Sequence, residues 1–214
     1  MAQVFPKWVD SIPKRLLIGI IIVLNGVVFG IWYFFSPEFT HMGYAPEQPV
    51  PFSHKQHVSV LGLDCQYCHT QVFESRHANI PGTQTCMNCH GQLATESEAL
   101  APVRESSDTG SAIEWIRVYD LPDYAYFNHS AHVNVGVGCE SCHGRVDRMD
   151  VVFQATPMSM SWCLDCHREP EKHVRPVDQV TEMGYNVANQ LETGRDLVAK
   201  HNINAPLYCQ SCHY

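Results

Sequence analysis

Five copies of the pattern Cys-x-x-Cys-His constrain this 214-residue chain more than any other feature of its sequence. All ten Cys belong to these copies, so none is left over for another purpose. A disulfide framework has no reason to place a His after every second Cys, and a structural zinc site needs paired Cys-x-x-Cys halves or distant His pairs. In chain order, motifs 1 to 5 are Cys65-Cys68-His69, Cys86-Cys89-His90, Cys139-Cys142-His143, Cys163-Cys166-His167 and Cys209-Cys212-His213.

Cys-x-x-Cys-His is the attachment signature of c-type haem. The two thiols form thioethers with the porphyrin edge, and the following His is an axial ligand of the iron. The pattern therefore predicts five covalently attached haem c groups, with the ten Cys as attachment points and the five motif His as proximal ligands. On this interpretation the chain is a pentahaem cytochrome c.

The motifs belong to an internal repeat. The sequence Phe-x-His-x-x-His occurs shortly before motif 1 and again shortly before motif 3, 75 residues later, and the second motif of each half is 77 residues from its counterpart. We interpret this as a duplicated two-haem module with motif 5 appended. Two His three positions apart share one face of a helical turn, so each can reach a different iron. The predicted distal ligands are His54, His57, His129 and His132.

The fold class predicted is a mostly α-helical and irregular multihaem cytochrome, with few or no strands and one N-terminal transmembrane helix. About 36 residues per haem leave the macrocycles to form the core, so haem binding supplies folding free energy that the apolar side chains cannot. The expected organisation is a cytoplasmic flank (1–15), a transmembrane anchor (16–36), two-haem modules (37–95 and 127–175) joined by a polar linker loop (96–126), and a C-terminal segment with the fifth haem (176–214).

The anchor prediction rests on Leu16–Phe35, which has no Asp, Glu, Lys or Arg and is long enough to cross about 30 Å of hydrocarbon. The flank before it is net positive and should stay cytoplasmic, which places the remainder on the periplasmic side of the bacterial inner membrane. A cleaved signal peptide is the alternative, but bulky aromatic residues follow the apolar segment instead of small ones. Gly26 and Gly30 are spaced for close approach of a neighbouring helix, and Asn25 offers an interhelical hydrogen bond.

Charge excludes one class of function. The net charge is −8 and no Lys/Arg block occurs, whereas a nucleic-acid binder depends on neutralising phosphates. The acidic outer portion instead suits a basic face on a protein partner.

Several segments carry a resemblance to known families. The run Phe127-Asn-His-Ser-Ala-His before Cys139 resembles the multihaem cytochromes of the c3 and c7 type, in which the first His of the pattern ligates the next haem and the second ligates a later one. The segments Ile80-Pro-Gly-Thr-Gln-Thr before motif 2 and Met160-Ser-Trp before motif 4 are similar to the pentahaem subunit of alternative complex III. That family has five haems and one N-terminal anchor. Its complex oxidises menaquinol.

The resemblance implies partners and ligands. The partners are an iron–sulfur protein, quinol-binding membrane subunits and a monohaem cytochrome, with electrons passing to a soluble carrier or a terminal oxidase. One haem lacks an obvious distal His. We expect a thioether there, and favour Met149 over Met158 and Met160 because the first module has Ser75 at the matching place. The remaining His41, His77, His173 and His201 have no repeat partner and are expected at the surface.

Haems with both axial positions filled leave no site for substrate, so we expect electron relay and no catalytic residue on this chain alone. Pentahaem nitrite reductases are an enzymatic rival, but their catalytic haem commonly carries Lys in place of the motif His. A closer rival is the membrane-anchored tetrahaem quinol dehydrogenase, whose first motif follows the membrane segment closely. Here about thirty residues separate Phe35 from Cys65. A metal-storage or structural cysteine protein would lack the visible bands of haem c.

Overall fold

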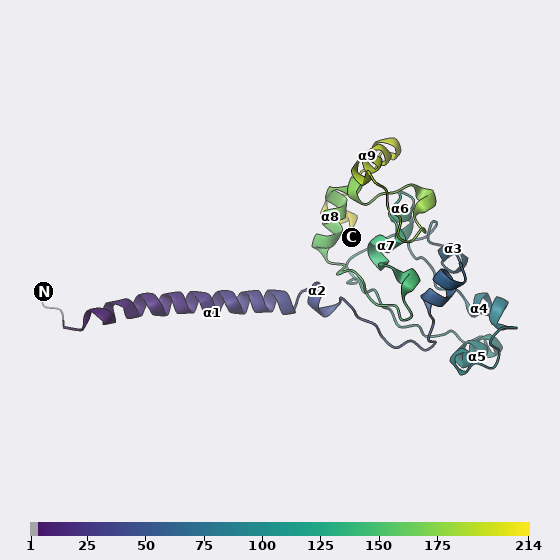
Figure 1. Ribbon diagram of the computed structural model, residues 1–214, viewed down its shortest axis with the longest axis horizontal. Coiled ribbons are helices and arrows are strands. Elements are labelled where there is room, and N and C mark those ends of the chain that lie inside the picture. The colour runs from purple at the N-terminus through teal and green to yellow at the C-terminus, as the bar shows by residue number, and fades with distance from the viewer. Residues whose placement is uncertain (1–3) are drawn as a thin grey trace. The chain divides into compact units, whose positions relative to one another are not determined.

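The computed structural model describes residues 4–214, so the first three residues of the expected cytoplasmic flank lie outside it. The chain divides into two units, one ending at His41 and the other spanning Met42–Tyr214. Figure 1 shows a single long helix in the first unit and short helices joined by irregular chain in the second. Among the described residues, the only β-structure is an isolated antiparallel bridge between Val137 and Val174. This agrees with the expectation of few or no strands.

The first unit consists of the 3₁₀ turn η1 (Lys7–Ser11), the long helix α1 (Ile12–Phe34) and the short helix α2 (Pro37–Thr40). Lys7–Phe34 is helical throughout and contains a window of mean hydropathy 2.4, so it is long and apolar enough to cross a membrane. A signal sequence shares this length and composition. The regular helix begins four residues before the apolar segment predicted from sequence, because Pro13 is tolerated in the first turn of a helix.

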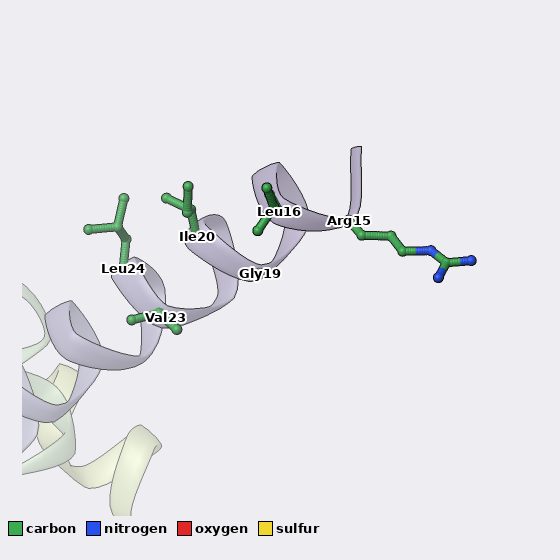
Figure 2. A pocket seen from close by; sticks show the side chains of 6 residues that line it. All are labelled: Arg15, Leu16, Gly19, Ile20, Val23 and Leu24. Carbon is green, nitrogen blue, oxygen red and sulfur yellow. The ribbon is translucent and has the colours of Figure 1, made fainter. Parts of the chain in front are cut away.

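The surface of α1 is open. Gly26 and Gly30 have no atom near the position a Cβ would take, whereas the Asn25 amide donates to the Ile21 carbonyl oxygen at 2.8 Å. The Asn25 amide thus bonds within its own helix, and contact of this face with a neighbouring helix stays a prediction. Figure 2 shows a shallow apolar hollow over Gly19, with the Arg15 side chain extending away from it; the other lining residues are Leu16, Ile20, Val23 and Leu24.

The second unit is built from short helices, most of them one or two turns long. Their bounds are η2, a π-helix (Lys55–Val60), α3 (Cys65–Cys68), α4 (Thr83–His90), η3 (Glu98–Leu100), α5 (Ala101–Thr109), α6 (His129–Val133), α7 (Cys139–His143), η4 (Val146–Arg148), α8 (Met160–Arg168), η5 (Pro170–Lys172), η6 (Val177–Gln179), α9 (Gln190–His201) and η7 (Cys209–Ser211).

The two modules dock on each other reciprocally. In the second module, α6 lies on the loop after motif 1, where the His129 backbone N–H donates to Arg76 O at 3.2 Å and the Asn134 amide donates to Phe73 O at 2.8 Å. In the first module, the segment 53–60 lies on the loop after motif 3. There the Lys55 amine meets the Asp150 carboxylate at 3.0 Å. Each histidine-bearing turn is thus held by the other module.

The C-terminal segment is fixed to motif 3. The Arg175 guanidinium donates to the Glu140 carboxylate at 2.8 Å and to Glu182 O at 3.0 Å. The Arg175 backbone passes so close to Gly136, and its guanidinium so close to Gly138, that a side chain at either glycine would overlap it. Gly136 also has φ +92°, a conformation that favours glycine. These contacts bring residues 174–184 against the helix that carries motif 3.

The segment expected as a linker loop contains a helix. Pro102 at the start of α5 and Gly110 in the left-handed conformation at its end define the boundaries, and both are common at those positions. Val103 of α5 is 2% exposed, and Ser106 shares a 2.6 Å hydrogen bond with Thr83 of α4. The sequence did not predict this helix, because the segment is polar and only one apolar side chain of α5 faces inward.

The protein core is sparse. Within residues 4–214, the buried apolar side chains contain no Leu, Ile or aromatic residue; they are Val50, Val72, Val103, Val133, Met149, Val174 and Val180. So small a set does not cover the apolar surface that a unit of this length needs to bury. This agrees with the expectation that bound groups, rather than apolar side chains, form the core of this unit.

Candidate haem-binding site

Each motif begins or continues a helical turn. Motif 1 forms α3, motif 2 ends α4, motif 3 forms α7, motif 4 lies in α8 and motif 5 forms η7. Positions i, i+3 and i+4 share one face of an α-helix, so both thiols and the imidazole lie on one side in motifs 2, 3 and 4, which are wholly helical. In motif 1 His69 follows α3, and in motif 5 Cys212 and His213 follow η7. The turns are capped locally: the Asp64 carboxylate accepts from Gln66 N at 2.7 Å, and the Ser159 hydroxyl accepts from Trp162 N at 3.3 Å. None of the ten cysteines forms a disulfide.

Seven of the nine predicted histidine ligands share one hydrogen-bonding pattern: ring atom Nδ1 faces a backbone carbonyl oxygen. A carbonyl can only accept, so Nδ1 carries the proton and Nε2 is left with a free lone pair, which is the arrangement of a metal-ligating histidine. The pairs are His57 with Ser53 O (2.8 Å), His69 with Asn79 O (2.7 Å), His90 with Leu93 O (3.2 Å), His129 with Arg76 O (2.9 Å), His132 with Asn128 O (2.8 Å), His167 with Pro206 O (2.7 Å) and His213 with Tyr124 O (2.8 Å).

The other two predicted ligands, His54 and His143, are held neutral by burial. Burial, with smaller contributions from His69 and His57, lowers the pKa of His54 to about 4. Burial followed by the nearby His129 lowers the pKa of His143 to about 4 as well. Nδ1 of His54 is buried and has no hydrogen-bond partner. Neutral imidazole is the form that ligates a metal, so both rings are in the required state at neutral pH.

Three distal histidines each face one motif histidine. The ring centroids are 6.2 Å apart for His57 and His90, 6.4 Å for His129 and His143, and 6.1 Å for His132 and His167. Bonds of about 2 Å from one metal to two opposed imidazole nitrogens, with each ring centre about 1 Å further out, give a separation of about 6 Å. The spacing fits two rings on opposite sides of one iron.

A phenylalanine orients the histidines of each module, a role that the sequence comparison of the modules had not assigned. Phe52 stacks on His57 at 4.3 Å and meets His54 edge-on at 4.9 Å. Phe127 repeats both contacts with its own histidine pair, at 4.5 Å and 4.8 Å. The signal was present in the sequence, because the Phe recurs at the same place in both copies of the repeat.

The donor set fits haem better than a bare ion. Nowhere in residues 4–214 do three or more His, Cys, Asp or Glu side chains gather as a metal site. Two opposed imidazoles suffice only when the bound group brings its own equatorial ligands, as a porphyrin does. Free paired thiols beside each motif His, and the sparse core, fit the same group.

Among the described residues, two motif histidines have no ring contact with a second histidine: His69 of motif 1 and His213 of motif 5. His213 has a ring contact with Tyr124 at 5.8 Å and none with a second His in the part of the chain that the structure describes. Met149 is 7% exposed and follows η4, with its methyl group near Gly144 beside motif 3. Met158 has φ +52°, and Met160 is 63% exposed. Distal ligation by Met149 stays a prediction.

The four remaining histidines lie at the periphery. His41, His77 and His201 are exposed, and His173 is half-buried. None of their ring nitrogens makes a hydrogen bond of the kind shared by the predicted ligands.

Two cytochrome families match different parts of this chain. Residues 50–107 match the family described as cytochrome c7 and related cytochrome c, and residues 131–214 match the cytochrome c3 family. A menaquinone reductase multihaem cytochrome c subunit from Nitratidesulfovibrio vulgaris (strain Hildenborough) is 35% identical over 127 residues, which are 59% of this chain and 56% of that relative. The helical and irregular fold is confirmed, and the two matched segments are similar to cytochromes of the c7 and c3 type, families whose members carry covalently bound haem c.

Proposed function

We propose that this chain is a membrane-anchored pentahaem cytochrome that relays electrons within a quinone-linked respiratory complex. The observation that carries the proposal is the opposition of histidine rings at 6.1 to 6.4 Å in front of motifs 2, 3 and 4. Rings on both sides of an iron leave no open position for a substrate, so the expected work is electron exchange.

The residues of each motif have separate parts in this function. The two thiols fix the porphyrin edge, the motif His and the distal His fill the axial positions, and the backbone carbonyls that bind Nδ1 keep each ring in its orientation. Haem supplies the reversible one-electron chemistry when bound. The protein holds the rings in place.

The first unit supports attachment to the bacterial inner membrane. α1 has the length and hydropathy of a spanning helix, and Lys14 and Arg15 lie near its N-terminal end. Basic residues on that flank favour a cytoplasmic N-terminus, which would place residues 42–214 and their haems on the periplasmic side.

We expect the chain to work inside a complex of the alternative complex III kind, which oxidises menaquinol and passes electrons toward a cytochrome c, an iron–sulfur carrier or an oxidase. Partner subunits would hold the quinol, because quinol oxidation needs a membrane site that places the quinol beside a proton acceptor and one apolar helix cannot enclose such a site. The matched relative favours a second candidate, since its name describes reduction of menaquinone. In that case electrons run in the opposite direction through the same relay.

The experiment compares the native complex with the purified chain, each loaded with haem and supplied with a menaquinol analogue. We expect rapid haem reduction in the complex and none above the chemical background in the partner-free chain. Quinol-dependent reduction of the isolated chain at the rate of the complex would reject the relay and restore the tetrahaem-type quinol dehydrogenase. Reduction of menaquinone by the complex with a low-potential periplasmic donor would establish the second candidate.

A further inference from the structure

We infer that the five motifs are arranged in space in the order 2, 1, 3, 4, 5, so that motifs 2 and 5 are the two ends at which electrons enter and leave. This inference rests on the proposed relay function. The order differs from that of the sequence because the two modules meet through their first motifs. Figure 1 shows α4 and α5 at one end of the second unit, with α7 between them and α8.

Motifs 1 and 2 are neighbours. The Asn88 amide of motif 2 donates to the Tyr67 hydroxyl of motif 1 at 3.2 Å. Burial and then the Cys86 thiol raise the pKa of Cys68. The opposed ligand His57 of motif 2 lies in the same turn as His54, three residues away. One turn of chain thus serves both motifs.

Motifs 1 and 3 meet at a common strip of backbone. The Cys65 thiol lies 4.0 Å from Thr181 O, and Cys139 N donates to Val180 O at 3.0 Å. A hydrogen bond that the Cys65 thiol donates to Cys139 is the first cause of the raised pKa of Cys65 and of the lowered pKa of Cys139. The reciprocal docking of the modules produces this contact, because each histidine-bearing turn is pinned next to the first motif of the other module.

Motifs 3 and 4 share the short helix α6. His129 faces the motif 3 histidine, and His132, one turn later, faces the motif 4 histidine. The Thr156 hydroxyl donates to Cys142 O at 2.9 Å shortly before α8 begins. Burial, and then the two thiols of motif 4, raise the pKa of Cys142 to about 12.

Motif 4 is in turn joined to motif 5. Nδ1 of His167 donates to Pro206 O at 2.7 Å, three residues before motif 5 begins. Burial followed by Cys212 raises the pKa of Cys163. Within residues 4–214, no hydrogen bond, ion pair or ring contact joins motif 2 to motifs 3, 4 or 5, or motif 5 to motifs 1, 2 or 3.

Solvent exposure identifies the same two ends independently. Cys89 of motif 2 and Cys209 of motif 5 are exposed, and the other eight cysteines are partly buried. Because electron transfer slows steeply with distance, a partner must approach a haem edge closely. The exposed cysteines therefore identify motifs 2 and 5 as the places where a partner protein can come close to a haem edge.

The test uses two matched variants of the haem-loaded full-length chain, His57→Met and His132→Met, which make the same change at equivalent positions of the duplicated modules. A thioether in place of imidazole raises the midpoint potential of its own haem. Because neighbouring charges interact, it also shifts the potentials of adjacent haems. His54→Met and His129→Met identify the signals of haems 1 and 3. The readout is an EPR-monitored redox titration that resolves the individual haems.

For the inferred order, His57→Met shifts the midpoint potentials of haems 2 and 1 only. His132→Met shifts those of haems 4, 3 and 5. A shift of haem 4 or 5 by His57→Met, in a chain whose mass shows five haems, would overturn the order while leaving the relay function intact. Missing haems or absent quinone-linked exchange in the native complex would instead reject the proposed function.

A second measurement uses the native chain in case the distal variants fail to mature. Brief hydroxyl-radical footprinting, read by mass spectrometry, should oxidise the thioether sulfurs of Cys89 and Cys209 several-fold faster than those of Cys65, Cys139 and Cys163. Equal or faster oxidation of the latter group would contradict the assignment of motifs 2 and 5 as the ends.

Discussion

At the scale of single residues, Arg175 shows how much one side chain can organise. Its side chain is 8% exposed and the Glu140 side chain is 16% exposed, so the pair is largely removed from water. Glu140 lies inside motif 3, and its second carboxylate oxygen accepts from Gly184 N at 2.6 Å. Removing one member of such a pair leaves an uncompensated buried charge.

Arg175→Ala should lower the free energy of unfolding by about 3 to 5 kcal/mol, because Glu140 would remain buried without its cation. Denaturant titration of the haem-loaded chain measures the loss. Arg117→Ala is the matched control, since its pair with Asp120 is 72% exposed on both sides and should cost about 0 to 1 kcal/mol. Equal effects of the two substitutions would show that the Arg175 pair is not structural.

His129→Ala should convert one haem of the second module to a high-spin state or to a foreign ligand, because it removes the ring that faces His143 at 6.4 Å. EPR and visible spectra measure the change. His201→Ala, at an exposed position, serves as the control and should leave every haem signal as it is. Unaltered spectra in His129→Ala would rule out distal ligation by that residue.

At the scale of elements, the helix α9 is held by a close backbone approach. Gly194 is buried, and a Cβ there would overlap the Glu171 carbonyl oxygen of η5. The Gln190 amide donates to Val174 O at 2.8 Å in the same contact. Because the backbone of α9 at Gly194 packs directly against the backbone of η5, only glycine fits at this position.

Gly194→Ala should loosen α9 and destabilise the chain by about 1 to 3 kcal/mol through overpacking, although alanine favours an unconstrained helix by about 1 kcal/mol. Hydrogen exchange of the α9 amides should become faster. Gly82→Ala is the control, because its Cβ would meet open space. Slower exchange in α9 after Gly194→Ala would refute the close packing.

The short-range elements could be predicted from sequence, and the long-range ones could not. The motif turns and the repeated His pairs follow from spacing within a few residues. The contacts of Arg175 with Glu140 and of α6 with the loop after motif 1 join residues 35 and more positions apart, and no local pattern encodes them. The helix α5 was missed because its inward face contributes Val103 alone, which gives no apolar periodicity.

At the scale of the whole molecule, the duplication explains both the sparse core and the spatial order of the motifs. Two modules that each trap groups between short helices need few apolar side chains of their own. Their reciprocal docking places motif 1 against motif 3 and leaves motifs 2 and 5 outermost. On the inferred order, the haems form a series whose two end members, at motifs 2 and 5, are available to different partners.

A pentahaem relay requires five haems on the mature chain. Denaturing mass spectrometry of the chain matured in its native host should show five covalent haem additions and no free thiol, because every one of the ten cysteines belongs to a motif. Four or fewer additions in properly matured protein, or cysteines recovered as disulfides or bound to zinc, would contradict the pentahaem relay.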